Sequence, residues 1–210
     1  MARVFEAVPL RINVTPSRTP KVRVVSVTLL LSPPGGVTCF VPDKAMDYAQ
    51  ITSRLYVGSH PQSVDDIEIL QRVLAITAIL NLQTNEDMAT VNLNWRPLET
   101  YYKASAVSLC RIPMKEEQVI LREKLLECVD TLVHLLMADH TVYLHCTAGI
   151  GRSPTVAVGY LHYHLGWELE AAVRYVKQVR KCSPHVEALR RAILDRETRE
   201  SESWTSSGQL

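Results

Sequence analysis

The sequence lacks the features on which several classes of protein depend. Its 23 Lys and Arg residues nearly match its 22 Asp and Glu residues, so a formal net charge of +1 offers no global field for nucleic acid or an anionic membrane. No apolar run approaches the roughly 20 residues that a membrane-spanning helix needs. Its five cysteines include no Cys-x-x-Cys pair, which argues against a disulfide framework and a zinc ribbon and favours a reducing compartment. We therefore expect neither nucleic acid nor a membrane as a partner.

Metal motifs are also missing. The sequence has no His-Glu-x-x-His stretch and no cluster of acidic residues of the kind that metal phosphatases use. His162 and His164 lie two positions apart, so on a helix they point to different faces and do not form a metal-binding pair. We therefore expect no metal and no other cofactor.

The two ends of the chain differ in composition from the middle. Residues 1–42 hold five Arg or Lys residues against one acid, together with many Ser, Thr and Pro residues. Such a composition is typical of an organelle transit peptide, although a disordered leader without any address is the alternative. Residues 200–210 are expected to form a polar tail.

Between these ends, strand-like and helix-like segments alternate. The apolar runs predict strands at residues 55–58, 76–82, 107–112 and 141–144, and the helical patterns fall at 63–74, 117–137, 153–165, 168–181 and 184–199. Ser63 is placed to cap the first of these helices. This alternation predicts a three-layer α/β domain, with a mainly parallel central sheet flanked by helices.

The most informative stretch runs from residue 142 to residue 154. An apolar strand delivers Cys146, two glycines permit a tight loop, and Arg152 follows at the start of a helix whose first turn tolerates Pro154. Backbone N–H groups in such a loop can converge on a tetrahedral anion, to which the helix N-terminus adds its partial positive charge. The expected phosphate-binding residues are Thr147, Ala148, Gly149, Ile150, Gly151 and Arg152.

This arrangement joins an anion receptor to a nucleophile. The planar guanidinium of Arg152 can bond two phosphate oxygens at once, and the same donors can stabilise a thiolate at Cys146. His145 is expected to orient the thiolate, its alternative being a core histidine. Ser153 is a candidate helix N-cap whose hydroxyl could also bond the leaving sulfur. The combination predicts phosphoryl transfer through a cysteinyl-phosphate, whereas a cysteine that is only a small buried side chain is the alternative for Cys146.

These residues carry a family resemblance. Residues 145–153 resemble the signature loop of the protein tyrosine phosphatase superfamily, and the Leu-Tyr-Val-Gly opening at 55–58 resembles its dual-specificity branch. The Cys-x-Ala-Gly-x-Gly-Arg form is similar to that of the glucan phosphatases, the group of laforin and the plant starch-excess and like-starch-excess phosphatases. The resemblance covers roughly residues 46–194 and implies a catalytic domain over 46–195. It further implies a phosphatase for phosphate monoesters on starch-like α-glucan, located in a plastid, with the cytoplasm as the alternative.

The sequence departs from the family in two places. The family's general acid is an Asp in the loop before the long helix, but residues 113–118 read Pro-Met-Lys-Glu-Glu-Gln and contain none. Glu116 is expected to replace that Asp, with Glu117 as the alternative. Glucan phosphatases also line their channel with aromatic rings, and residues 87–94 have none. The nearest candidates for glucan contact are Trp95, Tyr101 and Tyr102.

Two other functions stay open because of these departures. The missing aromatic residues favour a dual-specificity phosphatase that acts on phosphoserine, phosphothreonine and phosphotyrosine in proteins. The missing Asp favours a non-catalytic scaffold that binds phosphate or glucan.

Overall fold

The computed structural model describes residues 46–116 and 118–195. The predicted leader at 1–42, the predicted tail at 200–210 and the alternative acid Glu117 lie outside these residues. Within the part of the chain that is described, no helix combines the length and the apolar character needed to cross a membrane.

A five-stranded sheet with strand order β1-β2-β5-β3-β4 forms the centre of the fold. In this order the strands are Tyr48–Thr52, Leu55–Gly58, Val142–His145, Ala78–Asn81 and Ser108–Arg111. The edge strand β1 runs antiparallel to β2, and the other three pairings are parallel. The predicted α/β architecture with a mainly parallel sheet is thus confirmed.

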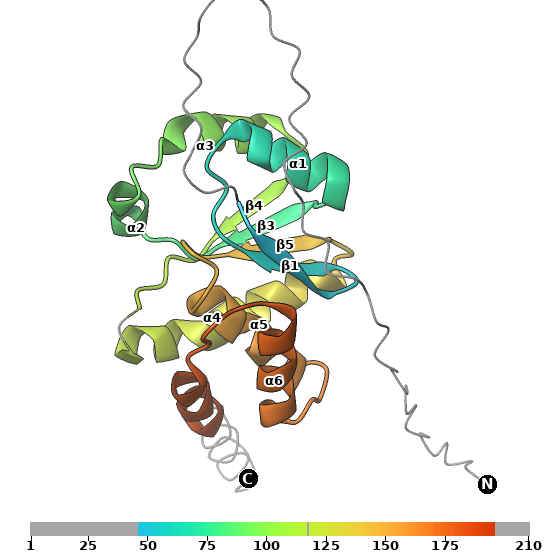
Figure 1. The fold of residues 1–210 in the computed structure, drawn as a ribbon, viewed down its shortest axis with the longest axis vertical. Helices are drawn as coiled ribbons and strands as arrows, with labels where there is room; N and C mark the ends of the chain where they lie inside the picture. The colour runs from blue at the N-terminus through green and yellow to red at the C-terminus, as the bar shows by residue number, and fades with distance from the viewer. Residues whose placement is uncertain (1–45, 117, 196–210) are drawn as a thin grey trace, which may run out of the picture. The chain divides into compact units, whose positions relative to one another are not determined.

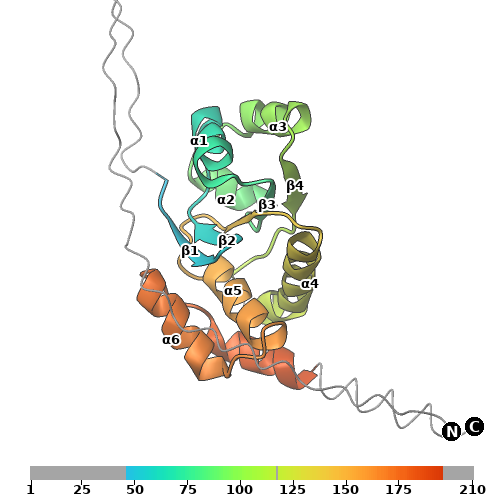
Figure 2. The same ribbon diagram turned by 90° about the vertical axis from the view of Figure 1, so that its right-hand side faces the viewer.

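Helices cover both faces of the sheet (Figures 1 and 2). Helices α1 (Val64–Leu74) and α3 (Trp95–Ala104) lie on one face. Helices α4 (Gln118–Met137), α5 (Arg152–Tyr163) and α6 (Leu169–Val179) lie on the other, and residues 186–195 are also helical. The short helix α2 (Asn85–Thr90) follows β3 at the end of the sheet.

The central strand β5 is buried along its whole length and supplies both halves of the core. Successive side chains of a strand point to opposite faces. Tyr143 accordingly packs into the cluster with α1 and α3, whereas Val142 and Leu144 pack into the cluster with α4, α5 and α6. Burial on both faces explains the continuous apolar run in the sequence.

The parallel strands fix the place of the functional loop. Strands β2, β5, β3 and β4 all end at the same edge of the sheet, because parallel neighbours share their direction. Ligands of open α/β folds bind outside the carboxyl ends of the strands. The loop that begins at Cys146 therefore leaves the sheet beside the segments that follow β2 and β3.

The cap of α1 is as predicted, whereas two strand lengths and three further elements differ from the prediction. Ser63 caps α1 through a capping box with Asp66. The strands around residues 76–82 and 107–112 are shorter than predicted, at four residues each. Strand β1 and helices α2 and α3 were not predicted from the sequence.

Candidate active site

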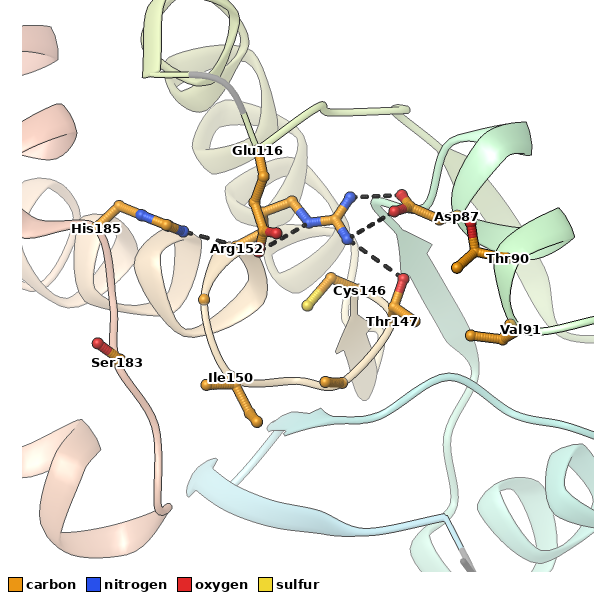
Figure 3. A pocket seen from close by; sticks show the side chains of 12 residues that line it. Asp87, Thr90, Val91, Glu116, Cys146, Thr147, Ile150, Arg152, Ser183 and His185 are labelled. Carbon is orange, nitrogen blue, oxygen red and sulfur yellow. Dashed lines mark hydrogen bonds and ion pairs between the residues drawn. The ribbon is translucent and has the colours of Figure 1, made fainter. Parts of the chain in front are cut away.

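The loop after β5 lines a pocket of about 460 Å³ (Figure 3). The pocket brings together segments that are far apart in the sequence. Its lining residues are Asp87, Thr90, Val91, Glu116, Cys146, Thr147, Ala148, Ile150, Gly151, Arg152, Ser183 and His185. Of the residues predicted to bind phosphate, all but Gly149 line it.

The carbonyl groups of this loop are bonded by donors from outside the loop. The donors are His145 Nδ1 to Cys146 O (3.1 Å), His60 N to Thr147 O (3.0 Å), Arg180 Nη2 to Ala148 O (3.2 Å), Arg180 Nε to Gly149 O (2.6 Å) and Ser183 N to Ile150 O (2.9 Å). In a trans peptide the N–H group points away from the preceding carbonyl. Five consecutive N–H groups, those of residues 147–151, therefore point away from these donors. This is the arrangement that an anion-binding loop needs.

Gly149 is required by both conformation and space. Its φ of +67° lies in the left-handed region that side chains disfavour. A Cβ atom there would also lie 2.4 Å from the backbone carbonyl of Gly58. Gly149 thus allows the loop to pass close to Gly58 at the end of β2. The carbonyl of Gly149 accepts the bond from Arg180 Nε there.

Cys146 and Ser153 lie together beneath the loop. Cys146 is 2% exposed, and the buried hydroxyl of Ser153 donates to its Sγ at 3.4 Å. The N-cap of α5 is Gly151, so Ser153 does not have the capping role that its sequence position suggested. Its contact with the sulfur does agree with the other expected role.

His145 is held in one orientation by its bond to the Cys146 carbonyl. A carbonyl oxygen only accepts, so Nδ1 of His145 carries the proton. Burial outweighs that bond and lowers the pKa of His145 to about 3. The imidazole is therefore neutral at physiological pH and fixes the backbone at Cys146 without adding charge.

Arg152 is buried and is held by a carboxylate that the sequence pattern does not predict, that of Asp87. Its Nη1 donates to Asp87 Oδ2 at 2.6 Å, and its Nη2 donates to Asp87 Oδ1 at 3.2 Å. Further bonds run from Nη1 to Met114 O (2.8 Å) and from Nη2 to Thr147 Oγ1 (3.3 Å). Within the described residues Nε makes no hydrogen bond.

Asp87 belongs to the first turn of α2, where it forms a capping box with Thr84. Partial burial opposes its ionisation, but hydrogen bonds from Arg152 and Thr84 outweigh this effect and hold the pKa of Asp87 below its ordinary value. The carboxylate is therefore charged at neutral pH and pairs with the guanidinium. The Thr-x-x-Asp spacing signals a helix start, but nothing in the sequence links it to Arg152.

Glu116 lies at the mouth of the pocket, as its predicted role requires. Its Oε1 is 3.8 Å from Arg152 Nε and 3.9 Å from His185 Nε2, and its side chain is 63% exposed. His185, for which the sequence predicts no role, precedes the helical residues 186–195.

The three aromatic residues considered for glucan contact lie on α3 and do not line this pocket. Trp95 packs beneath the Arg111 guanidinium, and the Tyr101 hydroxyl donates to Gln71 Oε1 at 2.8 Å. Tyr102 is only 5% exposed, so it has no ring face for a sugar and the predicted contact does not fit the structure.

The described residues contain no group of three or more His, Cys, Asp or Glu side chains arranged to hold a metal ion. The charges at the pocket come from Arg152, Asp87 and Glu116, and the nucleophilic atom is the sulfur of Cys146. The arrangement can bind an oxyanion and attack it from the loop's centre.

Comparisons with known proteins agree with this chemistry. The family described as "Dual specificity phosphatase, catalytic domain" matches residues 55–199. The chain is 34% identical over 151 residues to phosphoglucan phosphatase LSF1, chloroplastic, of Arabidopsis thaliana, covering 71% of this chain and 25% of that protein. It is 31% identical to laforin of Mus musculus (63% and 44% covered) and 28% identical to phosphoglucan phosphatase DSP4, amyloplastic, of Castanea sativa (77% and 44%).

The chain thus spans less than half the length of these three relatives. Among solved structures, that of PTPMT1 superimposes with a TM-score of 0.60 at 18% identity, covering 74% of this chain and 99% of the other. At this identity the likeness concerns the fold alone.

Proposed function

The chain belongs to the dual-specificity phosphatase family, and from this premise we propose that it hydrolyses phosphate monoesters on starch-like α-glucan through a cysteinyl-phosphate. The observation that carries the phosphatase chemistry is the orientation of the loop after β5. Its carbonyl groups accept bonds from outside the loop, so its N–H groups point the other way, and the sulfur of Cys146 and the guanidinium of Arg152 lie beside them in the pocket.

In the first step the Cys146 thiolate attacks phosphorus. The S–P bond forms while the ester P–O bond breaks, and the electron pair of that bond goes to the sugar oxygen. Glu116 gives its proton to this oxygen. The loop N–H groups and Arg152 Nε donate to the equatorial phosphate oxygens, where charge develops in the transition state.

In the second step water releases the phosphate. The Glu116 carboxylate takes a proton from water, and the water oxygen attacks phosphorus. The S–P bond breaks and its electron pair returns to Cys146 Sγ. The Ser153 hydroxyl, 3.4 Å away, stabilises the sulfur as it leaves.

The glucan substrate and a plastid location rest on the relatives. Two of them are named phosphoglucan phosphatases, one chloroplastic and one amyloplastic. The Arg-rich composition of residues 1–42 also favours import into an organelle. In this proposal residues 46–195 are the catalytic domain, the leader directs import, and glucan is held by the catalytic domain itself.

The test is phosphate release by the purified full chain from phosphorylated amylopectin and from phosphopeptides, with Cys146→Ser as the control. We expect faster release from amylopectin. Faster release from the peptides would transfer the assignment to a protein phosphatase. A full chain that turns over neither these substrates nor an aryl phosphate would be a phosphate-binding scaffold.

One observation favours the second candidate, a phosphatase for phosphoserine, phosphothreonine and phosphotyrosine. Among the described residues that line the pocket there is no Phe, Tyr or Trp side chain on which a sugar ring could stack. The apolar contacts at the pocket are made instead by Val91 and Ile150, which are exposed.

A further inference from the structure

We propose that His185 is a positioning residue for Glu116 and directs the carboxyl group toward the leaving oxygen. The inference rests on the proposed role of Glu116 as proton donor. It does not depend on whether the substrate is a glucan or a protein.

The backbone of His185 is hydrogen-bonded to the first turn of α5, the helix that follows the phosphate-binding loop. Its backbone N donates to Thr155 Oγ1 at 2.7 Å, and that hydroxyl donates to Gly151 O at 2.8 Å. The imidazole lines the pocket, and Figure 3 shows it directed toward Glu116 and Arg152. These bonds hold the backbone of His185 in place beside the exposed carboxylate of Glu116.

Gly151 provides the space in which the two side chains meet. A Cβ atom at this position would lie 2.7 Å from His185 Nε2 and 3.1 Å from Glu116 Oε1. Any side chain there would displace both groups. The imidazole and the carboxylate therefore approach the loop, and each other, because residue 151 is glycine.

Glu116 needs such a partner more than a shorter acid would. Its longer side chain has an additional rotatable bond, and it is 63% exposed, so many orientations compete. Within the described residues, the basic side chains whose nitrogen atoms lie nearest to Glu116 are Arg152, at 3.8 Å, and His185, at 3.9 Å. When a phosphate group occupies Arg152, the imidazole is the neighbour that remains.

The imidazole can serve both steps of the reaction. His185 Nε2 has no hydrogen-bond partner within the described residues. A shift of about 1 Å closes the 3.9 Å gap to hydrogen-bond distance, and Nε2–H then donates to one oxygen of Glu116. The other oxygen faces the leaving group, first as a proton donor and then as a base.

The test is a series of aryl phosphates with leaving groups from activated to poor, followed by an alkyl phosphate. His185→Asn is too short to reach Glu116, so we expect kcat to fall about tenfold to a hundredfold on the poor leaving groups and little on the activated ones. KM should change little. His185→Gln, whose amide extends further, should recover part of the loss.

A double substitution separates positioning from a general structural effect. In a Glu116→Gln background, His185→Asn should cause no further loss, because the group that it positions can no longer donate a proton. The matched control is His134→Gln, since His134 is exposed on α4 and lies outside the pocket. Inhibition by inorganic phosphate measures whether the loop is intact in each variant.

Two results would overturn the proposal: equal losses across all leaving groups, or losses that multiply fully in the double variant. Because both His185→Asn and His185→Gln are measured, the test remains valid if one of the two variants misfolds. A wild-type chain that cleaves aryl phosphates but not phosphorylated amylopectin would remove the glucan assignment and leave the test of His185 unaffected.

Discussion

The two sides of the pocket are built in different ways. On the phosphate side, Cys146, Arg152 and Ser153 are buried, and the carbonyls of the loop all have bonded partners. On the leaving-group side, Glu116 and His185 are partly exposed, and their contact is 3.9 Å long. The groups of the first side are thus held by hydrogen bonds in this structure, whereas the two groups of the second side lie beyond hydrogen-bond distance of each other.

This difference separates two kinds of catalytic contribution. A rigid set of donors stabilises the charge on phosphate whatever alcohol leaves, because the phosphate group is common to all substrates. Proton donation matters only when the leaving oxygen is a poor leaving group. Changes on the phosphate side should therefore reduce activity on every substrate alike, and changes on the leaving-group side should depend on the substrate.

The largest effect is expected from Cys146→Ser. The hydroxyl has nearly the size of the thiol but does not supply an anion at neutral pH, so turnover of every substrate should disappear. The thermal midpoint should change little, because the side chain remains small and buried. Phosphate release and a thermal melt check this. Residual turnover that is the same for all leaving groups would mean that another group is the nucleophile.

Next in size is the effect of Glu116→Gln, which removes the donated proton and keeps the side chain's length. We expect kcat to fall about 10² to 10⁴-fold on an alkyl or sugar phosphate and much less on an activated aryl phosphate. Steady-state kinetics on both substrates measure the ratio. If both rates are unchanged, the role passes to Glu117, and Glu117→Gln should then show the same dependence on the leaving group.

A smaller effect is expected on the phosphate side from Arg180→Lys. A single ammonium group cannot replace the fork that bonds Gly149 O, Ala148 O and Asp47 Oδ1. The loop N–H groups should lose part of their alignment, with a loss of about tenfold in kcat/KM on activated and poor leaving groups alike. Lys177→Arg, at an exposed position of α6, the helix that ends just before Arg180, is the control. If only poor leaving groups were affected, Arg180 would contribute to protonation of the leaving group and not to phosphate binding.

The sequence predicts the phosphate side well because its signals are local. A buried strand, two glycines and a proline-tolerant helix start lie within residues 142–154, and the structure shows that order. Strand β1 and helix α2 were not predicted because they are short, at five and six residues. Helix α3 is longer, but Pro97 reads as a helix breaker until it is placed in the first turn.

The groups that support the site could not be predicted from the sequence. These groups come from three separate segments, which hold His60, Asp87, and Arg180 together with His185. Each acts through a contact that exists only once the sheet and helices are packed. The Thr-x-x-Asp pattern before α2 predicts a cap, yet the same carboxylate also binds Arg152 across 65 positions of sequence. A spacing rule reports local structure and contains no information about such a partner.

The smallest predicted effect concerns the pair between Asp87 and Arg152. In Asp87→Asn the amide keeps the shape but loses the charge, so we expect a few-fold loss of kcat/KM and a loss of about 1 kcal/mol in the free energy of unfolding at pH 7. Asp139→Asn, which removes an exposed carboxylate paired with Arg54 at the surface, is the control and should change stability less.

The pH dependence of this loss tests its electrostatic origin. Partial burial opposes ionisation of Asp87, but the bonds from Arg152 and Thr84 prevail and place its pKa in the folded protein below that of the unfolded chain. The unfolded chain therefore takes up the proton first as the pH falls. The stabilisation is fully present above the unfolded pKa of about 4 and is lost as the pH falls through the folded pKa.

Urea unfolding of wild type and Asp87→Asn should thus show a difference in the free energy of unfolding at pH 7 that shrinks at pH 3. An equal difference at both pH values would mean that Asp87 supports Arg152 through shape and hydrogen bonding alone, and its charge would then have no part in fixing the phosphate side.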